Sequence, residues 1–514
     1  MSGAPTAPPG PDLAAGVSLA DVPDGSSLLG HVGDDAVLLS RRGDELFAVA
    51  ATCTHYGGPL GEGVIDGDTV RCPWHHACFS LRTGEALRAP ALNPIASWRI
   101  ERRGDRVALG DKIERDPLAP TYPIPSARTG TVHRIVIVGA GAAGSAAAEM
   151  LRRCGFDGSV TIVDEEESSP YDRPNLSKDY LAGNAPEEWI PIRPPDFYAG
   201  HAIEVVRARA TRIDVEGRAL EVSGHAPIPF DALLLATGAE PIHLPLPGAD
   251  LPHVRYLRSL ADSRSIIAAA SSATRVAIIG GSFIGLEVAA SLRARKLEVH
   301  VIAPEQLPLE RVLGTALGTF VKSLHEEHGV VFHLGHKPAS IDAAGVVLDD
   351  GSRVDAELVV IGVGVRPRLA LAEQAGLAMD RGVAVDPTLA TSVPGIYAAG
   401  DIARWPDPHS GERIRVEHWV VAQRMGQTAA RNMLGARESF DQVPFFWSAH
   451  YDLSINYVGH AEKWDAVRVD GDAAQRDVSV SFEQAGKRLA LATIFRDEES
   501  LRAELAMERD VTRG

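Results

Sequence analysis

Near residue 140 the chain reads His133-Arg-Ile-Val-Ile-Val138 followed by Gly139-Ala-Gly-Ala-Ala-Gly144. The apolar run predicts a buried strand, the glycines match the turn G-x-G-x-x-G, and an Ala-rich helix follows to about Arg153. The first glycine permits a tight turn, and the second lets the backbone approach a pyrophosphate. The third lets the helix pack closely with its positive N-terminus toward phosphate. This stretch therefore predicts an α/β domain with a parallel sheet that binds a dinucleotide.

The same pattern recurs about 140 residues further along the chain. Arg275-Val-Ala-Ile-Ile279 predicts a second buried strand, Gly280-Gly-Ser-Phe-Ile-Gly285 a second turn, and the residues to about Arg295 a helix. Ser282 replaces the middle glycine of the fingerprint, but its side chain is small and can donate a hydrogen bond. Two such units predict two bound dinucleotides.

A carboxylate about 20 residues beyond each turn identifies the ribose that the turn binds. The strand after the first turn ends in Asp164 and Glu165, and the spacing does not choose between them. The strand after the second turn ends at Ala303, where an acidic residue would mark NAD, and Glu305 follows two residues later. Because this strand end has no cluster of Arg or Lys that could bind the 2′-phosphate of NADPH, we expect NADH rather than NADPH.

Two short peptides upstream, Cys53-Thr-His55 and Cys72-Pro-Trp-His75, are separated by sixteen residues. Two thiolates and two imidazoles in matched pairs suit a Rieske [2Fe–2S] cluster, in which two His replace two Cys on one iron. A Cys2His2 zinc site uses the same atoms, but its spacing usually places the two Cys together and the two His together. We therefore expect Cys53, His55, Cys72 and His75 to be the metal ligands of a small β domain.

The composition narrows the class of protein. The formal charge of −17 argues against nucleic acid as a partner, because phosphate binding needs a basic surface. Four Cys in 514 residues are few, and the two outside the cluster peptides are Cys78 and Cys154, which fits a reducing compartment. No signal peptide is visible, and no apolar run reaches the roughly 18 residues of a membrane span. We expect a cytoplasmic protein.

Changes in pattern along the chain predict a multidomain protein. Strand-like alternation dominates the N-terminal part, prolines cluster around residues 116–125, and strands then alternate with helices. The expected parts are a flexible tail (1–16), an all-β Rieske domain (17–112), a Pro-rich linker (113–130), an FAD-binding domain (131–258 and 381–438), an NAD(P)-binding domain (259–380) and a small α+β C-terminal domain (439–514).

FAD is an expected cofactor because several further segments resemble the segments of one protein family in the correct order. Pro170-Tyr-Asp-Arg-Pro-Asn-Leu-Ser-Lys178 resembles the flavin-contacting segment of FAD-dependent ferredoxin reductases and of apoptosis-inducing factors. Ala236-Thr-Gly-Ala239 and Gly395-Ile-Tyr-Ala-Ala-Gly-Asp401 are similar to the second and third FAD elements of these proteins, and Glu417-His-Trp419 also resembles them. With the cluster peptides, the chain resembles Rieske-domain-containing apoptosis-inducing-factor-like flavoproteins of the pyridine nucleotide-disulfide oxidoreductase superfamily, whose two dinucleotide domains have a glutathione-reductase-like fold.

The resemblance implies roles for individual residues. Glu165 would bind the FAD ribose, Arg173 would lie along the flavin, and the backbone at Ala210 would meet the adenine. Asp401 would bind the flavin side chain. The expected catalytic residues are Lys178, Glu287 and Trp419, the first two as a pair near the reactive edge of the ring and the third as a cover beside the nicotinamide. The complete set of expected cofactor-binding residues is Gly139, Gly141, Ala143, Gly144, Asp164, Glu165, Arg173, Lys178, Ala210, Thr237, Gly238, Gly280, Gly281, Ser282, Ile284, Gly285, Glu305, Gly364, Gly400, Asp401 and Trp419.

Missing residues exclude related chemistries. Flavin disulfide reductases and flavin peroxidases need Cys beside the flavin, and residues 170–180 contain none. Rieske oxygenases need a mononuclear iron held by two His and a carboxylate. The sequence His325-Glu-Glu-His328 lacks the H-E-x-x-H spacing, and its position on an acidic helix predicts a solvated face instead.

Together these features predict an NADH-dependent flavoprotein oxidoreductase. NADH would pass hydride to FAD, the cluster would take single electrons, and an external acceptor, a protein or a small molecule, would receive them. Two alternatives stay open: an NADH-responsive redox sensor with slow turnover, and the reductase component of an oxygenase system. A homodimer is a further possible state of the chain.

Overall fold

The computed structural model describes residues 10–119 and 132–512, which form two compact units. The first unit contains the N-terminal residues to 123, residues 152–155 and residues 497–509. The second unit contains most of the remaining chain. Of the linker predicted at 113–130, residues 120–130 lie outside the described residues.

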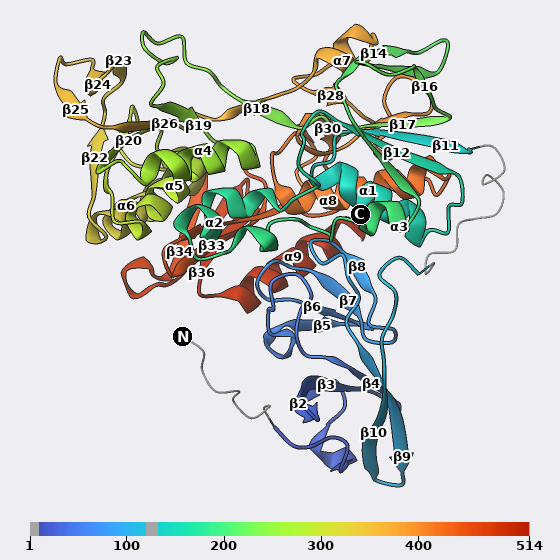
Figure 1. Ribbon diagram of the computed structural model, residues 1–514. Helices are drawn as coiled ribbons and strands as arrows, with labels where there is room; N and C mark the ends of the chain where they lie inside the picture. The colour runs from blue at the N-terminus through green and yellow to red at the C-terminus, as the bar shows by residue number, and fades with distance from the viewer. Residues whose placement is uncertain (1–9, 120–131, 513–514) are drawn as a thin grey trace. The chain divides into compact units, whose positions relative to one another are not determined.

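The N-terminal part of the first unit consists of two antiparallel sheets (Figure 1). Two apolar clusters form the core of this part. Val37, Trp98 and Leu109 of the six-stranded sheet belong to one, and the other joins residues of both sheets, among them Leu38 and Phe79, with Cys53 and Cys72. The six-stranded sheet has the order β1 (Val17–Ser18), β10 (Arg106–Ile113), β9 (Ser97–Arg103), β4 (Glu45–Ala50), β3 (Asp35–Arg42), β2 (Ser27–Val32), and the four-stranded sheet has the order β5 (Val64–Asp66), β6 (Thr69–Arg71), β7 (Cys78–Ser80), β8 (Ala86–Arg88).

The tail predicted at residues 1–16 is wrong for its second half. Leu13 is fully buried, and its backbone N–H donates to the carbonyl of His31 at 2.8 Å. A single apolar residue in a Pro- and Gly-rich stretch gave no periodic signal, but it fills a position in the core of the six-stranded sheet. Residues 1–9 lie outside the described part of the chain.

The last helix, α9 (Asp497–Thr512), also belongs to the first unit through residues 497–509. Three acidic residues occupy its first turn, where they interact favourably with the helix dipole. Its apolar residues Leu501 and Leu505 are buried against Val64 of β5. We predicted a C-terminal domain over 439–514 that includes this helix; the structure instead packs most of α9 with the N-terminal sheets.

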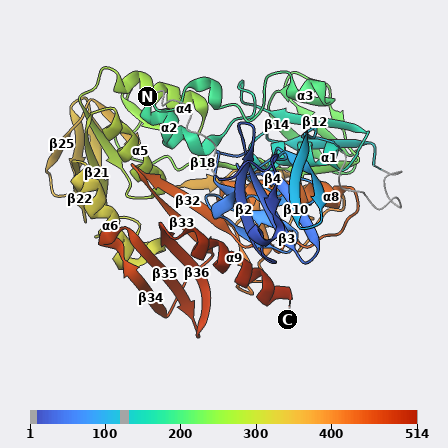
Figure 2. The same ribbon diagram turned by 90° about the horizontal axis from the view of Figure 1, so that it is seen from below.

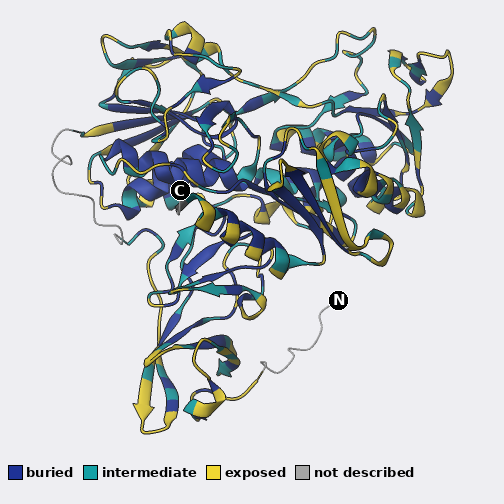
Figure 3. Ribbon diagram, turned by 180° about the vertical axis from the view of Figure 1, so that it is seen from behind, coloured by how far each residue is buried: buried dark blue, intermediate teal, exposed yellow. Residues whose placement is uncertain are grey.

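The second unit begins with a parallel sheet of order β13 (Ile203–Arg207), β12 (Ser159–Asp164), β11 (Arg134–Val138), β17 (Ala232–Leu235), β29 (Ile396–Ala398). The helix α1 (Ala142–Arg153) follows β11 directly, as the glycine turn predicts. β29 comes from far along the chain and completes this sheet by pairing with β17. Interior strands such as β11 and β17 are almost entirely buried, whereas many loop residues are exposed (Figure 3).

A second parallel sheet has the order β19 (Val254–Tyr256), β26 (Leu358–Ile361), β20 (Arg275–Ile279), β21 (Glu298–Ala303), β22 (Val330–Leu334). Its glycine turn joins β20 to α5 (Phe283–Ala294). The remaining helices of the unit are α2 (Asp179–Ala182), α3 (Phe197–Gly200), α4 (Leu260–Ala270), α6 (Glu310–Glu327), α7 (Ala370–Gln374) and α8 (Trp419–Met433). Its smaller sheets are β14 (Ala210–Asp214), β15 (Ala219–Val222), β16 (Ile228–Pro229); β18 (Ala239–Pro241), β27 (Val365–Pro367); β23 (Pro338–Asp342), β24 (Gly345–Leu348), β25 (Arg353–Asp355); and β28 (Val383–Ala384), β30 (Ala403–Pro406), β31 (Arg413–Ile414).

The C-terminal part of this unit is an antiparallel sheet of order β32 (Phe445–His450), β33 (Leu453–Gly459), β36 (Lys487–Ile494), β35 (Asp477–Gln484), β34 (Ala466–Asp472) (Figure 2). The predicted fold class, an all-β N-terminal domain before two α/β domains and an α+β C-terminal part, is confirmed. Within the described residues, every helix is too short or too polar to cross a membrane.

Candidate functional site

The two Cys/His peptides form two loops with the same backbone hydrogen bonds. The N–H of Cys53 donates to the Gly58 carbonyl at 2.8 Å, and the N–H of Cys72 donates to the Ala77 carbonyl at 2.8 Å. In each loop the cysteine carbonyl also accepts a hydrogen bond from the backbone N–H four residues later, which belongs to Gly57 in the first loop and to His76 in the second. The C-x-H peptide and the C-x-x-H peptide therefore form equivalent six-residue turns, although their Cys-to-His spacing differs by one residue.

The side chains of these loops converge in two pairs. The Nδ1 atoms of His55 and His75 face each other at 3.2 Å, and both cysteines are almost fully buried. A hydrogen bond between the two thiols raises the pKa of Cys53 and lowers that of Cys72. Burial lowers the pKa of His55 to about 3, so its ring is neutral and can act as a ligand. Gly58 is required here, because a Cβ atom would lie 2.5 Å from the Cys72 sulfur.

The separation of the two pairs discriminates between a zinc ion and a binuclear cluster. A tetrahedral zinc ion at about 2.0–2.3 Å from each ligand needs all four ligand atoms within about 4 Å of one another. Among the described residues, no three potential ligand atoms from Cys53, His55, Cys72 and His75 lie within 4.8 Å of one another. A thiol pair separated from an imidazole pair fits two irons, with Cys on one and His on the other.

A large cavity in the second unit brings together both glycine turns. Its volume is about 1430 Å³, above the roughly 300–1,000 Å³ of ordinary small-molecule sites. Gly139 has a φ of +104°, and a Cβ atom there would clash with the Ala236 carbonyl. At Gly141 the same test finds open space, so the backbone can approach a ligand. The predicted residues that line the cavity are Gly139, Gly141, Ala143, Asp164, Glu165, Arg173, Lys178, Ala210, Thr237, Gly238, Ser282, Ile284, Glu287, Gly364, Gly400, Asp401 and Trp419.

Five residues expected to bind cofactor do not line the cavity: Gly144, Gly280, Gly281, Gly285 and Glu305. The first four act within the turns and the helix–strand packing, because a Cβ atom at Gly144 or Gly285 would clash with the carbonyl that begins its own turn. The carbonyl of Glu305 accepts a backbone bond from Gly335. The spacing located the turns, but it does not show which glycines face a ligand.

Asp164 and Glu165, which the spacing left as alternatives, have different surroundings. The carboxylate of Asp164 accepts the N–H of Ala140 at 2.7 Å and the N–H of Glu166 at 3.0 Å, and burial raises its pKa. Glu165 is 41% exposed and pairs with Arg368 at 2.5 Å. Asp164 is therefore used by the turn itself, whereas the carboxylate of Glu165 is accessible at the cavity.

Lys178 and Glu287 form an ion pair of 2.8 Å inside the cavity. Glu287 lies on α5 and is only 3% exposed. Ser177 donates to the same carboxylate oxygen at 2.5 Å, and Ser448 donates to the other oxygen at 2.7 Å. A surface salt bridge would not be enclosed in this way, so the pair is a built part of the cavity wall.

Asp401 pairs with Arg258 at 2.9 Å, and both residues line the cavity. Burial lowers the pKa of Arg258, and the Asp401 carboxylate opposes that shift. The backbone carbonyl of Arg258 also accepts a bond from Arg173 at 2.6 Å. Sequence reasoning missed Arg258, because it follows a short strand without any glycine or acidic motif.

The start of α8 provides an aromatic wall. Trp419 is half-buried and lines the cavity with Phe446 and Trp447. His418 lines it as well, and its buried Nδ1 atom has no hydrogen-bond partner within the described residues. Unsatisfied buried polar atoms are rare and often indicate a group that a ligand satisfies.

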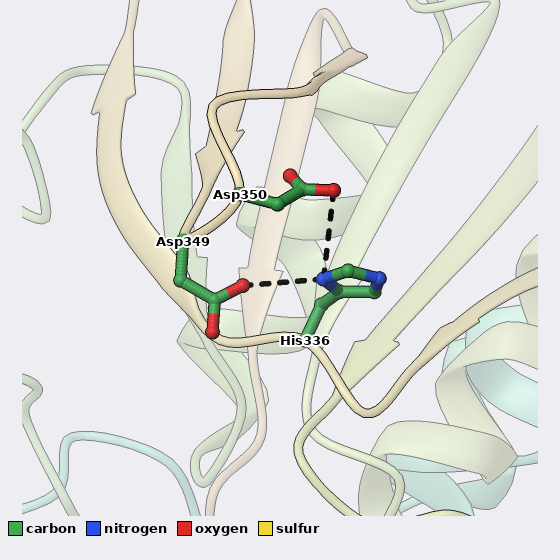
Figure 4. A group of neighbouring side chains, drawn as sticks. All are labelled: His336, Asp349 and Asp350. Carbon is green, nitrogen blue, oxygen red and sulfur yellow. Dashed lines mark hydrogen bonds and ion pairs between the residues drawn. The ribbon is translucent and has the colours of Figure 1, made fainter.

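The two histidines of the His325-Glu-Glu-His328 segment do not share one environment. The predicted solvated face is wrong for His325, which lies on α6 and is fully buried, and His328 is half-buried. Another group, His336 with Asp349 and Asp350, lies on the surface with ion-pair distances of 3.2 and 3.8 Å (Figure 4). None of its three residues lines the cavity, and we assign it no function.

Comparisons with known proteins agree with this geometry. The family model described as pyridine nucleotide-disulphide oxidoreductase matches residues 133–426, and the Rieske [2Fe-2S] domain model matches residues 16–99. Apoptosis-inducing factor 3 of Mus musculus is 30% identical over 93% of this chain and 81% of its own length. Rhodocoxin reductase of Rhodococcus erythropolis is 34% identical over 74% of this chain and 90% of its own. The crystal structure of a ferredoxin reductase for the CYP199A2 system of Rhodopseudomonas palustris is 34% identical, with a TM-score of 0.71, over 74% of this chain and 95% of that chain.

Proposed function

Because the chain belongs to the pyridine nucleotide-disulphide oxidoreductase family and carries a Rieske [2Fe-2S] domain, we propose that it oxidises NADH and passes single electrons through its cluster to an external acceptor. It is an NAD(P)H-dependent flavoprotein oxidoreductase with FAD and a [2Fe–2S] cluster as cofactors. We propose in particular that electrons pass from NADH to FAD, then to the cluster, and finally to the external acceptor.

One observation carries the proposal: the cavity that holds both dinucleotide turns is lined by no cysteine among the described residues. A thiol beside the flavin would offer a two-electron exit. Its absence leaves the Cys53, His55, Cys72, His75 site as the redox group that this chain supplies besides FAD. A cluster accepts one electron at a time.

The cavity residues divide into those that hold FAD and those that shape the reacting end. The glycine turn and the N-terminus of α1 would hold the pyrophosphate, and Glu165 would bind the ribose. Asp401, fixed by Arg258, would bind the flavin side chain. When bound, FAD accepts a hydride and releases electrons singly.

At the reacting end, the ion pair of Lys178 and Glu287 would orient the ring and hold a proton beside it. The carboxylate is enclosed and receives two serine hydroxyls, so its position is fixed before any ligand arrives. Trp419 would exclude water from the nicotinamide side. NADH is the expected donor, because Ala303 does not introduce a basic group for a 2′-phosphate.

An electron-transfer protein is the acceptor that we propose. The names of rhodocoxin reductase and of the ferredoxin reductase for the CYP199A2 system support this acceptor, because both relatives match about three quarters of this chain. We further propose a cytoplasmic location, which the low cysteine content of four in 514 residues supports.

The proposal is tested with Cys72→Ser in the full-length protein. We expect the variant to retain FAD and to reduce it with NADH, but to lose the cluster bands and the reduction of a one-electron acceptor such as cytochrome c. Full acceptor reduction without the cluster would contradict the proposal. Loss of flavin reduction together with loss of FAD would instead report misfolding, which the flavin spectrum detects.

A further inference from the structure

A continuous line of polar side chains leads away from Glu287. Ser448 donates to its carboxylate at 2.7 Å, and the Ser448 hydroxyl lies 3.1 Å from Nε2 of His450. Nδ1 of His450 lies 3.2 Å from Nε2 of His325, and Nδ1 of His325 lies 3.1 Å from the hydroxyl of Tyr451. Every link is within hydrogen-bond distance, and none of them belongs to the backbone.

The line starts in the cavity and ends at a half-buried side chain. Ser448 and His450 occupy alternate positions of β32, so both point to the same face of the sheet. Ser448 is 1% exposed, and His450 and His325 are fully buried. Tyr451 is half-buried and stacks on His328 with ring centroids 3.6 Å apart.

The hydrogen positions follow from the ionised Glu287, which can only accept. Ser448 must donate to it, so Nε2 of His450 must donate to Ser448. Nδ1 of His450 is then an acceptor for Nε2–H of His325, whose Nδ1 accepts the hydroxyl of Tyr451. All four hydrogens point toward Glu287, which is the arrangement of a proton wire.

Resting on the proposed function, we propose that Ser448, His450, His325 and Tyr451 are a relay that exchanges protons between Glu287 and solvent. Oxidation of NADH by a one-electron acceptor gives NAD⁺, two electrons and one proton. The acceptor takes the electrons only, so one proton must leave the cavity for each NADH. The relay provides a path for this proton through the wall of the cavity.

The transfer is balanced at each link. In an inward pass, the hydroxyl proton of Tyr451 moves to Nδ1 of His325, and the Nε2 proton of His325 moves to Nδ1 of His450. The Nε2 proton of His450 then moves to the Ser448 hydroxyl, which gives its own proton to Glu287. Solvent restores the hydroxyl of Tyr451. An outward pass is the reverse and needs the hydrogen of both rings on the Tyr451 side, so the rings must turn before it. The pass then restores the resting arrangement, with the hydrogens on Nε2. No electron moves through the relay.

Burial, together with the neighbouring charges, keeps both rings neutral, as a relay requires. Burial lowers the pKa of His450 to about 3, and the Lys178 ammonium contributes to the same shift. Burial also lowers the pKa of His325, with smaller effects from His450 and His328. A neutral ring keeps one donor and one acceptor nitrogen, whereas a cation would have no acceptor.

The experiment follows proton release and flavin reduction separately. Anaerobic stopped-flow in weak buffer with a pH indicator measures the proton that accompanies electron exit, for the wild-type protein, His450→Phe and Tyr451→Phe. We expect the rate of proton release to fall roughly tenfold in His450→Phe. Hydride transfer from NADH should be unchanged. The control His336→Phe, an exposed ring outside the relay, should match the wild type.

A second readout needs no turnover. In ¹⁵N-histidine spectra of the oxidised protein, His325 and His450 should both be neutral Nε2–H tautomers from pH 6 to 8, and Tyr451→Phe should shift only the Nδ1 signal of His325. Tyr451→Phe keeps the ring against His328, so folding is not at issue. Unchanged proton release in both relay variants, or the Nδ1–H tautomer on both rings, would overturn the relay. A failure of the proposed function would instead appear as a cluster that NADH never reduces in the wild type.

Discussion

Nδ1 of His76 lies 2.9 Å from the carboxylate of Glu504, and both side chains are fully buried although 428 residues separate them. His76 follows the proposed ligand His75 and has a φ of +60°. The equivalent position in the other cluster loop is Gly57, with a φ of +79°. A left-handed conformation suits glycine and disfavours other residues. Glu504 therefore holds a non-glycine residue in the backbone conformation that this loop requires.

Other charges of α9 reinforce this contact. Glu508 pairs with Arg71 at 2.7 Å and with Arg88 at 2.5 Å, one residue on each of two strands beside the second cluster loop. Ser500 lies 3.3 Å from the other ring nitrogen of His76. The C-terminal helix thus positions the cluster loop, and the first prediction tests this role.

We expect Glu504→Ala to destabilise the first unit by about 1–3 kcal/mol, because the buried His76 loses its acceptor. The same variant should lose iron faster than the wild-type protein on incubation with a chelator. Urea unfolding followed by the cluster absorbance measures the first effect, and iron content measures the second.

The matched control is Glu498→Ala on the same helix, whose exposed pair with Arg502 should contribute at most about 0.5 kcal/mol. His76→Gly provides a further check: it relieves the left-handed conformation but loses the hydrogen bond, so its stability should lie between those of the wild type and Glu504→Ala. Equal stability of Glu504→Ala and Glu498→Ala would remove the positioning role.

Removal of the Glu165 carboxylate should affect FAD binding, whereas removal of the Asp164 carboxylate should affect stability. Glu165→Ala is expected to weaken FAD binding about tenfold, the effect of one lost hydrogen bond to ribose, without changing the fold. Asp164→Ala leaves the N–H of Ala140 without its acceptor and should lower stability even without FAD. Calorimetric titration of FAD and thermal unfolding of the FAD-free variants separate the two effects.

The buried ring of His450 makes a pH-dependent contribution to stability. Its folded pKa of about 3 lies below the unfolded value of about 6.5, so the unfolded state binds a proton that the folded state does not. This contribution is present above pH 6.5 and is lost as the pH falls. It should cost up to about 2 kcal/mol at pH 5.

Replacing the ring by phenylalanine removes this titration. The free energy of unfolding of His450→Phe, measured by urea at several pH values, should therefore fall less steeply between pH 6.5 and 5 than that of the wild type. The exposed His336→Phe should keep the wild-type slope. Parallel slopes for all three proteins would mean that His450 is charged in the folded state.

Local motifs predicted the parts of the site whose chemistry lies in neighbouring residues. The glycines at 139–144 and the pairs at Cys53 and Cys72 are recognisable because a turn or a ligand pair needs fixed spacing. Arg258 could not be predicted, because its partner Asp401 is 143 residues away in the chain. The buried state of His325 depends on His450 of a distant strand, so the acidic composition of its helix was misleading. In the same way, nothing in the composition of α9 indicated that it would pack beside the cluster loops.

The most direct test of electron transfer through the cluster is anaerobic stopped-flow mixing of the full-length protein with one equivalent of NADH, with the flavin and cluster absorbance bands recorded separately. We expect the flavin band to bleach first and the cluster bands then to bleach while part of the flavin absorbance returns. A flavin that stays reduced beside an oxidised cluster, and that a one-electron acceptor reoxidises directly, would contradict it.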